Sequence, residues 1–332
     1  MQEILRLQPI YKEKIWGGRK LESFFQRNIP GGKIGESWEV SDYGKDLSVI
    51  QNGILKGKTL REAYRNDPEG ILGKSKIPFR EFPLLVKIID AQDRLSVQVH
   101  PDDRYAEEKD PESSGKKEAW YILQSDPKSE IVCGFSESLN RDSYRLMIER
   151  NEAEKPLQTF NAEKGNAFMI TPGTIHAIGK GNLILEVQQS SDSTYRVYDY
   201  GRIGDDGKPR PLHIQKSLDV LNFQKSDLSE FLKGHKADWK FGERKILNRN
   251  DKFFFEILKS NDNVFLPGVS DRPLFRIITV ISGRVNVSEE TFLAGDSFIL
   301  TAEGTEKNLS FQFSKNTEIA LMGPGSDWCE YE

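Results

Sequence analysis

The last quarter of the chain is a succession of short apolar segments separated by turn-forming residues, and this pattern leaves few folds open. Stretches that contain Gly, Asn or Asp interrupt the apolar segments between residues 253 and 322. Segments this short are typical of strands and too short for most helices. Several short strands in succession favour a sandwich or a barrel. We therefore predict strands over residues 253–258, 275–281, 284–287, 297–300, 309–313 and 319–322.

An internal repeat extends this prediction to the first part of the chain. The stretch Gly295 to Ala302, with the sequence GDSFILTA, has the same cadence as GNAFMITP at Gly165 to Pro172. The first copy continues through a Pro-Gly turn to His176, whereas the second continues to Glu303 and has no histidine. Repeated patterns of this kind indicate repeated structural units. We predict two related β-barrels, of which only the first keeps polar site residues.

A few helices accompany the strands. Thr59 precedes a helical pattern and has Glu62 three residues later, which is the signature of a capping box. Residues 140–152 have helical spacing, and Pro156 requires that helix to end before it. Residues 82–90 are almost entirely apolar and fit a largely buried strand. The expected architecture is mainly β, with a first domain over residues 1–240 that carries helical insertions and a second over 241–332.

Composition excludes several classes of protein. The chain has 332 residues, and 47 basic against 51 acidic side chains give a net charge of −4. This balance argues against disorder and against a nucleic-acid-binding surface. No apolar run approaches the roughly 18 residues of a membrane span, and the first residues do not resemble a secretory signal. The two cysteines, Cys133 and Cys329, form no CxxC pair, so we expect two reduced thiols in a cytoplasmic protein.

Four polar residues are placed for metal binding. Residues 95–100 alternate with period two, so Gln98 and His100 should lie on one face of a strand. Glu118 would lie on a neighbouring strand, and His176 opens a strand after a turn. Two imidazoles, a carboxylate and an amide oxygen would make a metal site, and two histidines with one glutamate form a familiar catalytic zinc set. The alternative is that Gln98 and His100 are hydrogen-bonded barrel residues and Glu118 is a surface charge.

At these residues the chain resembles a known family. The motifs are SVQVHPD from Ser96, Lys-Lys-Glu ending at Glu118, PGTIHA around His176, and Glu186 followed ten residues later by Arg196. In this order they resemble type I phosphomannose isomerase, in its short bacterial form, over residues 8 to 322. The resemblance implies two cupin-type (jelly-roll) barrels. It also implies one zinc ion per chain, with the four polar residues just described as its ligands.

The resemblance further implies interconversion of mannose 6-phosphate and fructose 6-phosphate, with Arg196, Lys116 and Glu186 in the active site. This reaction moves a proton between two carbons through a cis-enediol, so it needs an electrophile and a base. Glu186, a neutral Lys116 and a zinc-bound hydroxide all stay open as the base. Arg196 stays protonated and suits the enediolate or the phosphate. Ser96 could bond to phosphate or within the barrel, and Trp16 could line the sugar pocket or the core.

Two other functions remain possible on the same barrel. One is a cupin that binds a sugar phosphate without chemistry, and the other is a metal-dependent oxygenase, which favours iron. Lys116, Glu186 and Arg196 beside a full ligand set favour the isomerase. We expect a small sugar phosphate as the partner and a monomeric chain, because no long exposed apolar stripe is evident.

Overall fold

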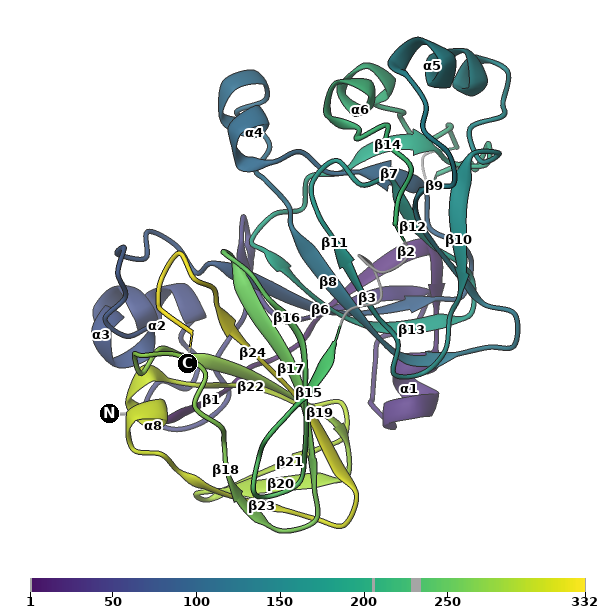
Figure 1. Cartoon of the computed structure of the whole chain (residues 1–332). Coiled ribbons are helices and arrows are strands. Elements are labelled where there is room, and N and C mark those ends of the chain that lie inside the picture. The colour runs from purple at the N-terminus through teal and green to yellow at the C-terminus, as the bar shows by residue number, and fades with distance from the viewer. Residues whose placement is uncertain (1, 205–206, 228–233, 332) are drawn as a thin grey trace.

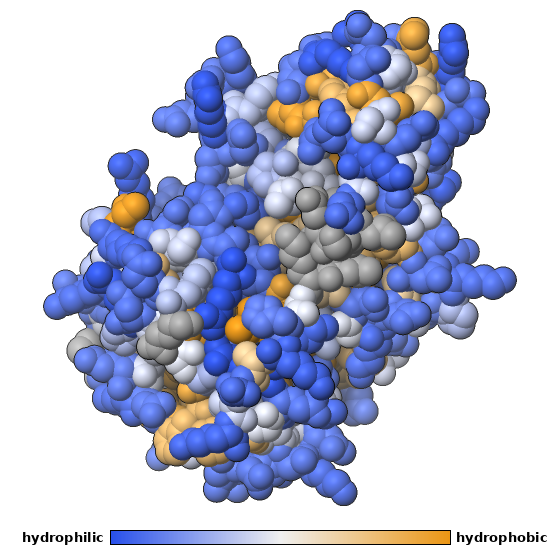
Figure 2. Space-filling model, in the orientation of Figure 1, coloured by the Kyte–Doolittle hydropathy of each residue, from blue (hydrophilic) through white to orange (hydrophobic). Residues whose placement is uncertain are grey.

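A computed structural model describes residues 2–204, 207–227 and 234–331, and this part of the chain is mainly β, as predicted. Figure 1 shows two β units side by side, with α5 (Arg141–Glu149) and α6 (Ile214–Val220) at the far end of the first unit and α8 (Ala302–Glu306) at the edge of the second. The face of the molecule in Figure 2 is largely hydrophilic, with apolar side chains gathered near α5 and α6. No helix in the described ranges is long and apolar enough to cross a membrane.

The first unit consists of two antiparallel sheets. Within the described residues, a six-stranded sheet runs in the order β11 (Ala167–Ile170), β8 (Glu118–Ser125), β13 (Asn182–Gln189), β6 (Leu84–Ala91), β2 (Ile10–Gly18) and β3 (Ile34–Val40). A five-stranded sheet runs in the order β10 (Leu157–Asn161), β9 (Glu130–Phe135), β12 (His176–Ile178), β7 (Val97–Val99) and β14 (Tyr195–Tyr198).

The second unit has the same two-sheet plan. In the described part of the chain, its seven-stranded sheet has the order β1 (Ile4–Arg6), β22 (Ser297–Leu300), β19 (Arg276–Ser282), β24 (Thr317–Pro324), β17 (Phe253–Ser260), β16 (Glu243–Arg249) and β15 (His235–Ala237). Its four-stranded sheet has the order β18 (Asn263–Phe265), β23 (Ser310–Phe313), β20 (Arg284–Val287) and β21 (Glu290–Leu293). β4 (Asp42–Tyr43) and β5 (Asp46–Leu47) form a separate hairpin.

The internal repeat forms strands in both units, as predicted. Residues 167–170 form β11 and residues 297–300 form β22. The two copies then diverge, because the first turns into β12 at His176 while the second enters α8 (Ala302–Glu306). Thr301 caps this helix by accepting a hydrogen bond from the amide of Gly304. The second unit therefore has a helix at the position where the first unit has a site histidine.

The predicted capping box is present. Thr59 Oγ1 accepts from the Glu62 amide at 3.2 Å, and Glu62 Oε2 accepts from the Thr59 amide at 2.7 Å, at the start of α2 (Leu60–Asn66). Asn140 caps α5 in the same reciprocal way. The remaining described helices are α1 (Lys20–Phe25), α3 (Pro68–Ile71) and α4 (Asp103–Lys109).

The strands β6, β8, β11 and β13 of the six-stranded sheet are buried on both faces, and this explains their largely apolar sequences. Side chains alternate across a strand, so Leu185 on one face of β13 enters a core shared with the second unit, where Phe255 and Phe275 also lie. Ile184 on the other face enters the interior of the first unit. The rings of Tyr121 and Phe255 meet across the two units, with centroids 6.4 Å apart.

The division at residue 240 stays a prediction. β1, from the start of the chain, pairs in register with β22, so that Leu5 lies opposite Ile299. β15 pairs with β16, with His235 opposite Ile246.

Candidate metal centre and cavity

Three elements bring the predicted metal-binding side chains to one place inside the first unit. β7 carries Gln98 and leads directly to His100, and β12 begins at His176, which lies opposite Gln98 in the register of the five-stranded sheet. Glu118 is the first residue of β8 in the facing six-stranded sheet. The side chains of both sheets thus converge between them.

The donor atoms lie close together. Nε2 of His100 is 3.5 Å from Oε2 of Glu118, and Nε2 of His176 is 3.4 Å from Oε1 of Glu118. Donor atoms of these three residues all lie within 4.8 Å of one another, and each of the three residues is buried. Glu118 is 0% exposed, so the alternative interpretation that it is a surface charge is wrong.

Several of these buried donor atoms lack a hydrogen-bond partner. Within the described residues, no geometrically acceptable hydrogen bond reaches either ring nitrogen of His100 or either carboxylate oxygen of Glu118. Lys116 Nζ approaches Oε2 of Glu118 to 3.0 Å as an ion pair. Buried polar atoms are costly unless they are satisfied. The buried imidazole of His100 and the carboxylate of Glu118 face each other without such a hydrogen bond, which is the arrangement expected of ligands to a shared cation.

Electrostatics keeps the donors in the protonation state that metals require. Burial, aided by the Lys116 charge, lowers the pKa of His100 to about 3, so its imidazole is neutral at pH 7. Burial also lowers the pKa of His176. Burial alone would raise the pKa of Glu118, but Lys116 and the two histidines outweigh it and hold that pKa well below its usual range. Neutral imidazoles and an ionised carboxylate are ligand forms.

The orientation of His176 is fixed by its other ring nitrogen. Nδ1 lies 2.9 Å from the carbonyl oxygen of Thr174, to which it can donate, and this leaves the lone pair of Nε2 directed at the centre. Such a contact to the second nitrogen is what metal-binding histidines usually have. The amide of Gln98 lies 3.2 Å from the same Nε2 atom. Gln98 is thus within reach of the centre, although less tightly placed than the histidines.

A cavity of about 190 Å³ opens beside this centre. Seven of the nine predicted site residues line it: Trp16, Ser96, Gln98, Lys116, Glu118, Glu186 and Arg196. The other two, His100 and His176, lie behind it against Glu118. Trp16 is both a core residue and a wall of the cavity, because only 4% of it is exposed.

Arg196 and Ser96 lie together at one end of the cavity. Nε of Arg196 is 3.3 Å from Oγ of Ser96, and Nη1 donates to the Pro211 carbonyl at 2.8 Å. Within the described residues Arg196 has no carboxylate within ion-pair distance, so its charge is available. Arg210, which also lines the cavity, donates instead to both carboxylate oxygens of Asp199.

The sequence analysis did not select five charged residues that line the cavity, namely Lys14, Glu36, Lys87, Asp192 and Arg210, and three of these form one cluster. Glu36, Lys87 and Asp192 line the wall beside Glu186, and Nζ of Lys87 lies 3.3 Å from Oδ1 of Asp192 and 4.0 Å from Oε2 of Glu36. Burial would lower the pKa of Lys87, but these two carboxylates raise it, so the ammonium stays charged. A single lysine inside the apolar run Leu84 to Asp90 was the available signal, since only a buried polar partner makes such a residue tolerable.

Glu186 is the titratable group with an unusual environment. It lies opposite Lys87 in the register of β13 and β6, and Nε1 of Trp120 donates to its Oε1 at 3.3 Å. Burial and the charge of Glu118 raise its pKa to about 8, in spite of Lys116 and Lys87. A carboxyl whose pKa lies near neutrality can both release and accept a proton, which makes it suited to acid–base work.

Comparison with known proteins places this arrangement in context. Residues 4–145 match the family described as phosphomannose isomerase type I, catalytic domain. A mannose-6-phosphate isomerase of Streptococcus mutans is 45% identical over 225 residues, which are 68% of this chain and 70% of that protein. A probable mannose-6-phosphate isomerase of Bacillus subtilis is 42% identical over 229 residues, with 68% and 71% covered.

Solved structures agree over nearly the whole chain. The crystal structure of the mannose 6-phosphate isomerase from Bacillus subtilis superposes with a TM-score of 0.85 at 32% identity, and covers 97% of this chain and 99% of that one. A putative mannosephosphate isomerase from Archaeoglobus fulgidus has a TM-score of 0.76 at 22% identity, with 97% of both chains covered. The second likeness shows that the fold persists in more distant sequences.

Proposed function

The chain belongs to the type I phosphomannose isomerase family, and from this premise we propose that it interconverts mannose 6-phosphate and fructose 6-phosphate at the cavity beside Glu118. The observation that carries the proposal is the convergence of three buried donor groups, among which His100 and Glu118 have no hydrogen bond within the described residues. Neutral His100 and His176 and ionised Glu118 bring donor atoms within 4.8 Å of one another, and all three residues are buried.

The donor set fits zinc. Two imidazoles and one carboxylate are a typical catalytic zinc set that leaves a position open, and we propose one zinc ion per chain. A turn of the Gln98 amide, which lies 3.2 Å from Nε2 of His176, would direct its oxygen to the same centre as a fourth ligand. When bound, zinc supplies a Lewis acid that stabilises negative charge on the sugar oxygens. All four ligands come from one chain, which is consistent with a monomer.

The charges of the cavity orient the substrate. We assign the phosphate to the end with Arg196 and Ser96, because a guanidinium without a carboxylate partner binds a phosphate in bidentate fashion. The cavity is also lined by Glu36, Lys87 and Asp192, which can accept from and donate to sugar hydroxyls. Trp16 supplies an apolar wall for the sugar ring. This polarity favours a phosphorylated hexose over a neutral one.

Glu186 is our candidate for the group that carries the proton between the two carbons. It lies in the lining of the cavity together with Glu118 and Lys116, and in the metal-free chain burial and the charge of Glu118 raise its pKa to about 8. Lys116 is less suited, because its ammonium is paired with Glu118. That pairing instead lets Lys116 hold the carboxylate of Glu118 in place and donate a hydrogen bond to a substrate oxygen.

A coupled assay with mannose 6-phosphate, run with and without a chelator, tests the proposal. We expect turnover that the chelator abolishes and that added zinc restores. Binding of mannose 6-phosphate without turnover would instead indicate a sugar-phosphate-binding cupin. Uptake of oxygen in the presence of ferrous iron would indicate an oxygenase. Either result would overturn the isomerase proposal.

A further inference from the structure

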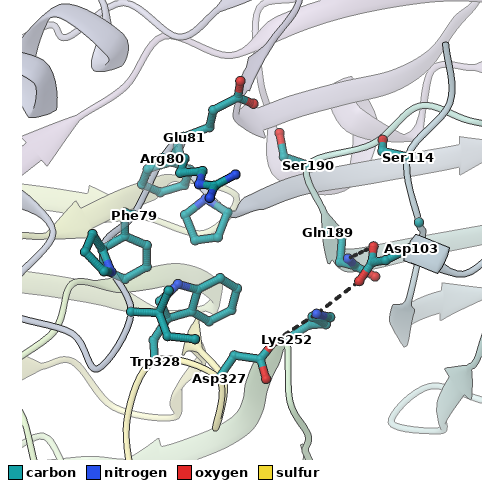
Figure 3. Close-up of a pocket in the computed structure, with 15 residues that line it drawn as sticks. Phe79, Arg80, Glu81, Asp103, Ser114, Gln189, Ser190, Lys252, Asp327 and Trp328 are labelled. Atoms are coloured by element: carbon teal, nitrogen blue, oxygen red, sulfur yellow. Dashed lines mark hydrogen bonds and ion pairs between the residues drawn. The ribbon is translucent and has the colours of Figure 1, made fainter. Parts of the chain in front are cut away.

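The segment that joins two of the proposed metal ligands is held by the second β unit. We call residues 101–117, which connect His100 to Glu118 and include α4, the metal loop. The metal loop lies against the turn between β16 and β17 and against the chain that follows β24 (Figure 3). Both of these segments adjoin strands of the seven-stranded sheet. We propose that Lys252, in that turn, is a positioning residue for the metal centre and for Lys116.

Lys252 forms ion pairs with Asp103 and Asp327 across the junction, in addition to a longer one of 3.9 Å with its neighbour Asp251. Its Nζ lies 3.0 Å from Oδ2 of Asp103 in the metal loop and 2.8 Å from Oδ2 of Asp327 after β24. The side chain of Lys252 is 20% exposed, whereas that of Asp103 is 54% exposed, so only the lysine side of the contact is shielded from water. Lys117, at the other end of the metal loop, forms a further ion pair with Asp251 of the same turn. The turn therefore binds both ends of the metal loop.

Gln189 connects Asp103 to Lys117 at the other end of the metal loop by hydrogen bonds. Nε2 of Gln189 donates to Oδ1 of Asp103 at 3.0 Å, as Figure 3 shows, while Oε1 of Gln189 accepts from the Lys117 amide at 2.9 Å. The backbone N–H of Gln189 in turn donates to the backbone carbonyl of Lys117 at 3.1 Å. Gln189 ends β13, the strand that carries Glu186. One amide side chain thus ties together the start of the metal loop, its end and the strand of the proposed proton carrier.

Asp103 also packs directly beside the residue before Lys116. A Cβ atom at Gly115 would lie 2.1 Å from Oδ1 of Asp103 and 2.5 Å from its amide nitrogen, so only glycine fits there. The amide of Lys116 then donates to the carbonyl of Pro101 at 3.1 Å, which closes the metal loop on itself. Any movement of Asp103 away from Lys252 would be transmitted through this contact to Lys116, whose Nζ is 3.0 Å from Glu118.

The geometry assigns Lys252 a role that a simple surface ion pair does not have. It neutralises Asp103, and thereby fixes the backbone on which Lys116 and two proposed ligands stand. The kinetic part of the inference rests on the proposed isomerase activity, whereas its metal-binding part does not. This difference allows the two to be tested separately.

The test uses Lys252→Met, which keeps the aliphatic stem and removes the charge, in the zinc-loaded full chain. We expect zinc transfer to a chromogenic chelator to be about 10-fold faster, as is usual when an interaction that supports a ligand is lost. We expect kcat to fall roughly 10-fold with little change in KM, because a small misplacement of a catalytic group acts on the chemical step. Lys252→Arg, which keeps the charge, should have a zinc-transfer rate and a kcat close to those of the wild type.

Lys307→Met is the matched control. Lys307 also lies in the C-terminal part of the chain and pairs with two carboxylates, those of Glu3 and Glu303, but it lies away from the metal loop. The Lys307→Met variant should have the same rate of zinc release and the same kcat as the wild type. The double variant Asp103→Asn with Lys252→Met should show the same zinc-transfer rate and the same kcat as Lys252→Met alone, because both substitutions act through one contact.

The outcomes separate the proposals clearly. Unchanged zinc release and unchanged kcat in Lys252→Met, with only a lower unfolding midpoint, would overturn the positioning role. Fully additive losses in the double variant would overturn the route through Asp103. A wild-type chain without isomerase activity would overturn the proposed function, while the rate of zinc release would still report on Lys252.

Discussion

Oε1 of Glu118 lies 3.4 Å from Nε2 of His176, so a strand from each of two facing sheets places one donor in the same buried volume. Neither strand could create this pair alone, because the two residues belong to different sheets. The contact between these sheets is therefore what makes the centre, and the following experiments probe its consequences.

Removal of one imidazole should abolish metal binding. We expect His100→Ala to lose zinc affinity by more than about 100-fold, because loss of a mere supporting partner already costs 10- to 100-fold. Elemental analysis of the purified variant measures this directly. The exposed His235 offers the control, since His235→Ala should keep one zinc per chain. Equal zinc in His100→Ala and in the wild type would contradict the ligand set.

Acid should destabilise the metal-free chain. The pKa of His100 is about 3 in the folded chain and near 6.5 when unfolded, so below pH 6.5 the unfolded state takes up a proton that the folded state refuses. Between pH 6.5 and 5 this one group should lower the free energy of unfolding by about 2 kcal/mol. Urea denaturation of chelator-treated protein at both values measures the loss. In His100→Gln the free energy of unfolding should fall less between pH 6.5 and 5. An identical decrease in this variant and in the wild type would contradict the role of His100 in the pH dependence.

Replacement of Glu186 should separate chemistry from metal binding. Glu186→Gln keeps the shape of the side chain but cannot carry a proton, so we expect kcat to fall by about 100-fold or more, in the usual range for a general base. Zinc content should not change. A variant with full kcat would show that the proton is carried by another group, with Lys116 as the next candidate.

Loss of Arg196 should weaken recognition of the phosphate. A charged hydrogen bond of about 1.5–3 kcal/mol corresponds to a factor of roughly 10 to 150, so Arg196→Ala should raise KM for mannose 6-phosphate by that factor. Its zinc content should stay at the wild-type level. Arg141→Ala, which removes an ion pair with Asp219 on α6, is the matched control. An unchanged KM in Arg196→Ala would place the phosphate elsewhere.

Removal of a helix cap should affect stability alone. Thr59→Ala removes the hydroxyl that accepts from the Glu62 amide at the start of α2, and should lower the free energy of unfolding by about 1 kcal/mol. Its kcat should equal that of the wild type, since α2 contributes no residue to the cavity. Chemical denaturation and the coupled assay together check both statements.

Local sequence rules sufficed wherever a residue's role depends on its neighbours in the chain. Period-two alternation placed Gln98 near His100, and Thr59 with Glu62 marked a helix start, because both patterns act within a few residues. The short-strand pattern likewise predicted most strands of the second unit. Even the repeat at Gly295 was visible without coordinates.

The remainder depends on contacts between segments far apart in the sequence. Glu36 and Asp192 lie on different segments and become cavity residues only through their approach to Lys87. Nothing near Lys252 indicates that it reaches Asp103, because the two are joined only by packing between the β units. Sheet register and the packing between units decide such contacts, and neither leaves a local sequence signature.

The six-stranded sheet has one face in the core shared with the second unit, and this has a consequence for how the protein can be divided. A fragment that ended after the first unit would present Leu185 and Tyr121 to water where Phe255 now covers them. Exposed strands of this kind promote aggregation. We therefore expect the two β units to unfold in a single cooperative transition. We also expect the first unit, expressed without the second, to precipitate, so that neither unit can be engineered independently of the other.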